Sequence, residues 1–152
     1  MRTSSPADLL DPIAAEAATE SPLWGDAVRA DREHGPVFGT LVPQRFALGL
    51  ETIYEGYLVH YGRPRLFAPP DADVALLLGD YLYAHGLVRI AATGDLDAVA
   101  ALAELISTCA HLRAEGEEGD VHAWLAAVAR LGGSPASADV EQAMAAHAER
   151  VG

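Results

Sequence analysis

The stretch DVALLLGDYLYAHGLVRIAATGDLDAVAALAELISTCAHLR, residues 73–113, decides the fold of this 152-residue chain. Its apolar residues recur at steps of three and four, a spacing typical of helices with one buried face. They are Ala75, Leu76, Leu78, Gly79, Leu82 and Tyr83 in the first half, and Leu102, Leu105, Ile106 and Cys109 in the second. Asp71 or Asp73 can cap a first helix. Gly94 suits a left-handed turn, and Asp95 can cap a second helix. The stretch therefore predicts a helical hairpin so apolar that other parts of the molecule, or a partner, must cover it.

Further helices are predicted on both sides of this hairpin, separated by loops that carry glycine and proline. Pro12 is expected to break the first of them, and Asp120 to cap the one that follows the hairpin. The expected helices span about 7–19, 23–34, 43–61, 121–131 and 138–150. No strand of usable length is predicted, so the expected fold is an all-α helical bundle. We divide it into an N-terminal helical segment with no assigned role, residues 1–42, and a helical core, residues 43–152.

Composition excludes several classes of function. The net charge is -12, from 10 Lys and Arg against 22 Asp and Glu, which argues against a nucleic-acid groove and against docking on anionic lipid. One cysteine rules out an internal disulfide and fits a reducing, cytoplasmic location. Charged residues such as Asp80, Arg89 and Asp95 interrupt the apolar runs, so no transmembrane segment is predicted.

Motifs for nucleotide, zinc or redox chemistry are absent from the sequence, which has no Walker loop, GxGxxG, CxxC or HExxH pattern. Six histidines are scattered along the chain. His85 and His111 can meet across the hairpin, but scattered histidines are more often surface or hydrogen-bonded core residues, so no metal site is predicted. Cys109 is expected to be a buried structural thiol.

Two carboxylates, Asp80 and Glu51, stand among apolar residues. Burying either one costs several kcal/mol, roughly, unless it is paired or hydrogen-bonded. Asp80 therefore faces a polar cavity, meets a partner such as Tyr54 or His85, or lies on the less buried face of its helix. Glu51 has the same alternatives, and together with Tyr54 it is a candidate for a polar cavity. For both acids, a solvated helix stripe is the competing interpretation.

A resemblance to a known family is carried by Gly79-Asp80-Tyr81-Leu82 followed by Thr93-Gly94-Asp95. This order of motifs resembles the trans-polyprenyl diphosphate synthases. Upstream, the helix containing Glu51 and the loop Gly62-Arg63-Pro64 are similar to the region around the family's first aspartate-rich motif. The resemblance covers roughly Phe46 to the C-terminus and implies part of the isoprenoid synthase fold.

The chain departs from that family where its chemistry lies. His60-Tyr61-Gly62 stands in place of the DDxxD motif, which binds magnesium and the allylic diphosphate. A trinuclear magnesium site needs several oxygen ligands held together. The chain ends before the point where a second aspartate-rich motif would come, and it contains no lysine. No cofactor is therefore expected in this chain, and magnesium would be bound by a partner subunit.

The resemblance implies a non-catalytic small subunit of a heteromeric polyprenyl diphosphate synthase, which pairs with a catalytic large subunit and helps to set product length. The residues expected to line its product tunnel or its interface are Leu78, Asp80, Leu82, His85, Leu87 and Ile90. The alternative is a free-standing homodimeric module that binds an isoprenoid or another apolar ligand. An enzyme of another kind, built on Asp80, Glu51, Tyr54 and His85, ranks last.

Overall fold

The computed structural model describes residues 6–33 and 35–151. Within those residues every regular element is helical, which confirms the all-α prediction, and Val28 and Phe67 form an isolated β-bridge. The elements are α1 (Pro6–Glu20), α2 (Pro22–Asp26), the 3-10 turn η1 (Gly39–Leu41), α3 (Gln44–Tyr61), α4 (Ala72–Ala91), α5 (Leu96–Glu115), α6 (Asp120–Arg130) and α7 (Ser137–Val151).

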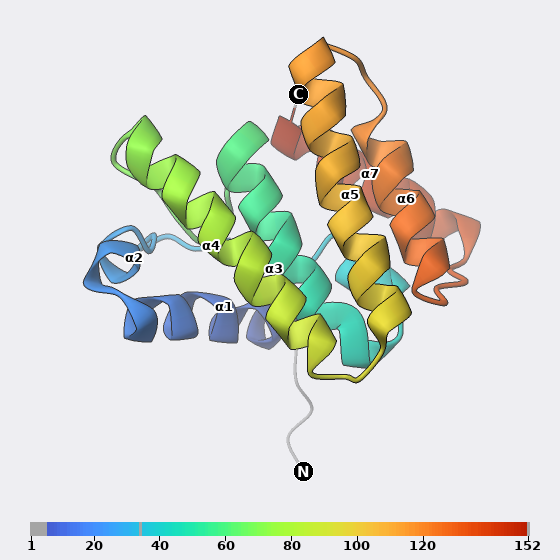
Figure 1. Ribbon diagram of the computed structural model, residues 1–152, viewed down its shortest axis with the longest axis horizontal. Coiled ribbons are helices and arrows are strands. Elements are labelled where there is room, and N and C mark those ends of the chain that lie inside the picture. The colour runs from blue at the N-terminus through green and yellow to red at the C-terminus, as the bar shows by residue number, and fades with distance from the viewer. Residues whose placement is uncertain (1–5, 34, 152) are drawn as a thin grey trace.

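Helix α3, rather than the α4–α5 hairpin, is the centre of the molecule. Of its 18 residues, 13 are buried. It contacts α1, α4, α7 and η1, and Figure 1 shows it behind α4, between the N-terminal helices and α5. The hairpin was expected to organise the chain because its sequence is the most apolar. Instead α4 packs mainly on α3, and α5 packs on α6 as well as on α4.

Four glycines let α3 and α4 approach closely. A Cβ atom on Gly56 would lie 3.0 Å from the carbonyl oxygen of Gly79, and one on Gly86 would lie 3.0 Å from that of Gly49. The pairs are seven residues apart on each helix, so both lie on the facing sides of an antiparallel crossing. Glycine in mid-helix costs roughly 1 kcal/mol relative to alanine, and this crossing accounts for that cost.

The predicted helix ends are right at the hairpin, whereas the expected cap at Asp120 and the expected break at Pro12 are wrong. Asp71 and Asp95 each accept a hydrogen bond from the backbone N–H three residues on, at 2.9 Å, and Gly94 has a φ of 82°. Asp120, however, caps nothing: Gly119 holds the cap position, and the Asp120 side chain is buried instead. Pro12 lies inside a continuous α1, whose inner side chains are held in the core.

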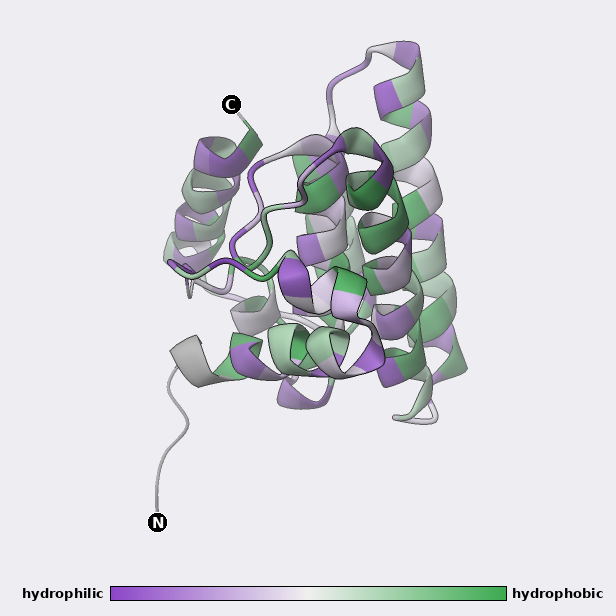
Figure 2. Ribbon diagram, turned by 90° about the vertical axis from the view of Figure 1, so that its left-hand side faces the viewer, coloured by the Kyte–Doolittle hydropathy of each residue, from purple (hydrophilic) through white to green (hydrophobic). Residues whose placement is uncertain are grey.

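The N-terminal segment belongs to the same fold as the rest. One cluster of buried side chains joins α1 to α3, α4 and the loop before α4: Leu10, Ile13, Ala14, Ala17, Ala27, Val59, Leu66, Phe67, Leu78 and Leu82. The other cluster centres on α3 and includes Val37, Phe38 and Leu41, which precede position 43. The helix expected at 23–34 is only α2, because the chain turns after Asp26 to make the bridge to Phe67. Figure 2 shows strongly hydrophobic residues interspersed with hydrophilic ones on the outer helices.

Candidate functional site

The apolar residues singled out on α4 lie in the chain's own core. Leu78, Leu82 and Ile90 are fully buried, and Leu87 is partly buried against the same core. Leu78 and Leu82 pack in the cluster that includes α1. A partner that docks on this fold would therefore not touch these three leucine and isoleucine side chains.

The polar residues singled out on α4 do not come together in one site. Asp80 has a side chain that is 66% exposed and lies 3.3 Å from Nε2 of His60, so it is on the less buried face of its helix. His85 stacks on Tyr81 and lies 3.6 Å from a carboxylate oxygen of Glu16. His111 is exposed on α5.

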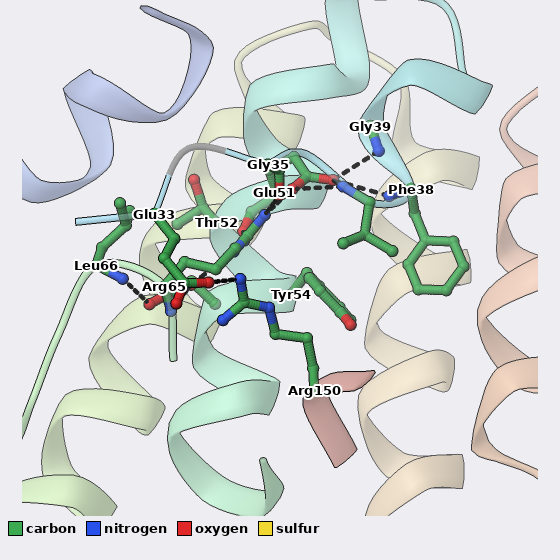
Figure 3. A network of polar contacts seen from close by, with 12 residues as sticks. Glu33, Gly35, Phe38, Gly39, Glu51, Thr52, Tyr54, Arg65, Leu66 and Arg150 are labelled. Carbon is green, nitrogen blue, oxygen red and sulfur yellow. Dashed lines mark hydrogen bonds and ion pairs between the residues drawn. The ribbon is translucent and has the colours of Figure 1, made fainter. Parts of the chain in front are cut away.

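Glu51 is fully buried and is the centre of a hydrogen-bond network (Figure 3). Its Oε2 accepts from the backbone N–H groups of Val37, Phe38 and Gly39 at 3.1, 3.0 and 2.6 Å. Its Oε1 accepts from the guanidinium of Arg65. The solvated stripe is therefore excluded for Glu51, and both of its oxygens are satisfied by the chain itself.

Glu55, one turn further along α3, completes this network. Its Oε1 accepts from Nε of Arg65 at 2.9 Å, and its Oε2 accepts from the backbone N–H of Leu66 at 2.9 Å. Arg65 also donates to the carbonyl of Gly35 at 2.9 Å. We call Glu51, Glu55 and Arg65 the buried clasp, because they hold the loops around residues 35–39 and 65–66 against α3.

Electrostatics keep Arg65 charged inside the protein. Burial alone would lower the pKa of Arg65, but the carboxylates of Glu51 and Glu55 outweigh it and hold that pKa above its ordinary value. Two carboxylates face one guanidinium, so the three backbone N–H groups at Val37–Gly39 supply the remaining positive potential. With its oxygens occupied and no exposed surface, the clasp is a structural unit rather than a reaction site.

Tyr54 is buried beside this network and points into an aromatic cluster. Its hydroxyl shares a hydrogen bond of 2.9 Å with Nδ1 of His147 on α7. Its ring meets those of Phe38 and Trp124 edge-on, at 5.3 and 5.1 Å between centroids. Burial raises the pKa of Tyr54 and lowers that of His147, so both groups are neutral at pH 7. Glu51 and Tyr54 thus lie in the packed interior of the protein.

The sequence predicted that the hairpin needs a cover, but not which of its residues stay exposed on its outer face. Four of the five large hydrophobic side chains that are exposed in the described residues lie on it: Leu76, Leu77, Val88 and Leu96, at 54% to 76% exposed. Ala84 on α4 and Ala100 on α5 are also exposed. We call this surface the hairpin face; α4 and α5 lie at the front of Figure 1. The helical spacing showed that these residues lie on helices, but not which side α3 would cover.

The charge around the hairpin face is acidic. Between residues 72 and 115 the acids are Asp73, Asp80, Asp95, Asp97, Glu104 and Glu115, against two arginines, Arg89 and Arg113, and Glu104 is paired with Arg130 on α6. Arg89 is itself paired with Glu16 on α1. An apolar surface with such a rim suits a partner whose own rim is basic.

Helix α4 is long and apolar enough to cross a membrane, and 28% of its 18-residue apolar window is buried inside the protein. Mostly buried core helices and signal sequences pass the same test of length and composition. In the residues that the structure describes, no group of three or more His, Cys, Asp or Glu side chains is arranged to hold a metal ion.

Neither a protein-family model, nor a curated protein, nor a solved structure matches this chain.

Proposed function

We propose that this chain is a docking subunit without catalysis of its own, which works by binding another protein through the hairpin face. The partner we propose is the catalytic large subunit of a polyprenyl diphosphate synthase, and the complex would use this chain to help set product length. The hairpin face carries the docking part of the proposal. The named partner rests on the sequence resemblance at Gly79–Leu82 and Thr93–Asp95.

The hairpin face favours association because it gathers exposed leucines and valine on one surface. Soluble monomers expose single hydrophobic side chains routinely, but four of the five large ones exposed in the described part of the chain gather on one hairpin, which favours an interaction site there. Leu76, Leu77 and Val88 follow the length of α4, and Leu96 begins α5. The exposed alanines, Ala84 and Ala100, leave room for a partner helix to approach closely.

The acidic rim favours a different chain over a second copy. In a symmetric dimer the same patch meets itself. Residues 72–115 carry six acids and two arginines, so a symmetric contact would bring an excess of negative charge together across the interface. Like charges in such an arrangement cost several kcal/mol, roughly, whereas a basic rim on another protein would meet them favourably.

The test is reconstitution of the full chain with a candidate large subunit that carries both aspartate-rich motifs. We expect a stoichiometric complex in native mass spectrometry and a change in product chain length when this chain is added. The double variant Leu77→Glu, Val88→Glu should abolish the complex. Leu23→Glu is the matched control, because Leu23 is 43% exposed but lies on α2 rather than on either helix of the hairpin.

Each contrary outcome has a definite meaning. A complex that forms unchanged with the double variant would remove the hairpin face from the proposal. Product length that is the same with and without the chain would remove the regulatory role. A homodimer in place of the heteromer would favour the free-standing binding module.

A further inference from the structure

A cleft of about 600 Å³ opens on the side of the molecule formed by the end of α5, the turn before α6, and α7. Its lining includes Arg113, Asp120, Val121, Met144, His147 and Val151. None of these residues belongs to the hairpin face or to the buried clasp. The cleft is therefore a second feature, independent of the proposed docking.

Asp120 lines the cleft and has one carboxylate oxygen without a partner among the described residues. The residue is 7% exposed, and its Oδ2 accepts hydrogen bonds from the Tyr57 hydroxyl and from Nε of Arg113, the latter at 2.8 Å. Its Oδ1 is buried and has no hydrogen-bond partner among the described residues. Buried carboxylate oxygens are nearly always paired, so this one points to a donor that enters from outside the chain.

The positive charge nearest to Asp120 is already engaged. Arg113 donates to Asp120 and, through its second terminal nitrogen, to Tyr57 at 2.9 Å, and it lies 5.1 Å from the centre of the Tyr61 ring. His147, which also lines the cleft, shares its Nδ1 with Tyr54. Neither group is placed to compensate further acids.

Glu117 and Glu118 leave the cleft negative. Both are exposed and belong to its lining, in which Arg113 is the one arginine or lysine. With Asp120 and Arg113 paired to each other, these two carboxylates set the sign of the potential at the mouth. A cation is therefore attracted to the cleft and an anion is repelled.

The rest of the lining is apolar. Val121, Met144 and Val151 are partly buried and lie on α6 and α7. They offer an aliphatic surface beside the carboxylate, and methionine adapts readily to ligands of different shape. We propose that the cleft binds a small aliphatic primary amine in its ammonium form, which donates a hydrogen bond to Oδ1 of Asp120 and packs its alkyl chain against these three residues.

The experiment is a calorimetric titration of the full chain at pH 7 with n-pentylammonium chloride, 1-pentanol and sodium pentanoate. The three probes share an alkyl chain and differ in the head group. We expect n-pentylammonium to bind most tightly, because it alone combines N–H donors with positive charge. Binding of pentanol or pentanoate as tight as that of the ammonium, or no binding of the ammonium, would overturn the proposal.

Variants locate the site. Asp120→Asn should weaken n-pentylammonium binding by roughly tenfold or more, because it removes a charge-assisted hydrogen bond. Glu117→Gln and Glu118→Gln, on exposed residues outside the helices, should each weaken it by about two- to fivefold without affecting the fold. Glu141→Gln, an exposed acid on α7 outside the cleft, should leave the affinity unchanged. Equal effects from Glu141→Gln and the two rim variants would show non-specific attraction to an acidic protein and would also overturn the proposal.

Discussion

The most constrained residue in this protein is Arg65. Its side chain is fully buried and joins Glu51, Glu55 and the carbonyl of Gly35. Burial of one of these charges by itself costs far more than an exposed salt bridge returns, so the clasp is stable only as a complete set. The clasp holds the loops around residues 35–39 and 65–66 in place against α3.

Replacing Arg65 should therefore cause one of the largest losses of stability available in this chain. We expect Arg65→Met to lower the free energy of unfolding by roughly 3–5 kcal/mol, because two buried carboxylates lose their cation. Urea unfolding followed by circular dichroism measures this. The control is Arg130→Met, which breaks an exposed pair with Glu104 and should cost at most about 1 kcal/mol. Similar losses in both variants would contradict this account of the clasp.

Cys109 allows a second prediction at the scale of single residues. The side chain is buried, as the sequence indicated, and burial raises the pKa of its thiol to about 12. Only the thiolate reacts rapidly with disulfide reagents, and at pH 8 this thiol is protonated. We expect Cys109 not to react with Ellman's reagent in the native protein at pH 8. In about 6 M guanidinium chloride one thiol per chain should react, because the pKa of the unfolded thiol returns to its ordinary value. Rapid reaction of the native protein would show that the site opens.

At the scale of elements, the sequence predicted which segments are helical better than it predicted how they pack. The caps at Asp71 and Asp95 are local interactions, so they could be read directly from the chain. The central position of α3 could not, because its burial comes from contacts between segments far apart in sequence. Glu51 shows the same limit: its partners, Arg65 and the backbone at 37–39, follow from the path of two loops.

For the candidate site too, the sequence indicated the helix but not which of its sides is buried. Helical spacing identified α4 as apolar and separated Leu78 from Leu77, but it put Leu76 on the same face as Leu78. Only the position of α3 shows that Leu78 is in the core and that Leu76 is at the surface. The pair Glu51 and Glu55, one turn apart in an apolar helix, was the available signal for the clasp.

The α3–α4 crossing gives a prediction at this scale. Gly86→Ala should destabilise the protein by roughly 1–3 kcal/mol even though alanine favours helices, because its Cβ would lie 2.5 Å from a side-chain carbon of Ile53. Gly25→Ala is the matched control, since its Cβ would meet its nearest atoms at 3.5 Å, an ordinary contact. Thermal unfolding of both variants measures the difference. A gain of stability in Gly86→Ala would mean that the helices can separate at little cost.

At the scale of the whole molecule, the dominant property is negative charge. The net charge is -12, and the hairpin exposes Asp73, Asp80 and Asp97 as well as its large hydrophobic side chains. Charge of one sign keeps copies of the chain apart and attracts proteins of the opposite sign. An exposed apolar face is less of a liability on such a molecule than on a neutral one.

The approach to a partner should accordingly depend on salt. We expect the association rate constant with a basic-rimmed large subunit to fall by about tenfold or more between low and high ionic strength, while the dissociation rate changes less. Stopped-flow measurements over a range of sodium chloride concentrations would show this. A rate that is independent of salt would indicate that the acidic rim takes no part in the encounter.

The burial of α3 has a consequence for exchange of its amide hydrogens with solvent. Helices on the surface can open locally, but an element enclosed by α1, α4, α7 and η1 exposes its amides only when those elements separate. The central turns of α3 should therefore take up deuterium at the rate of global unfolding, while α2 and the ends of α7 exchange sooner. Deuterium uptake at this one helix would then report the stability of the entire chain, free or within a complex.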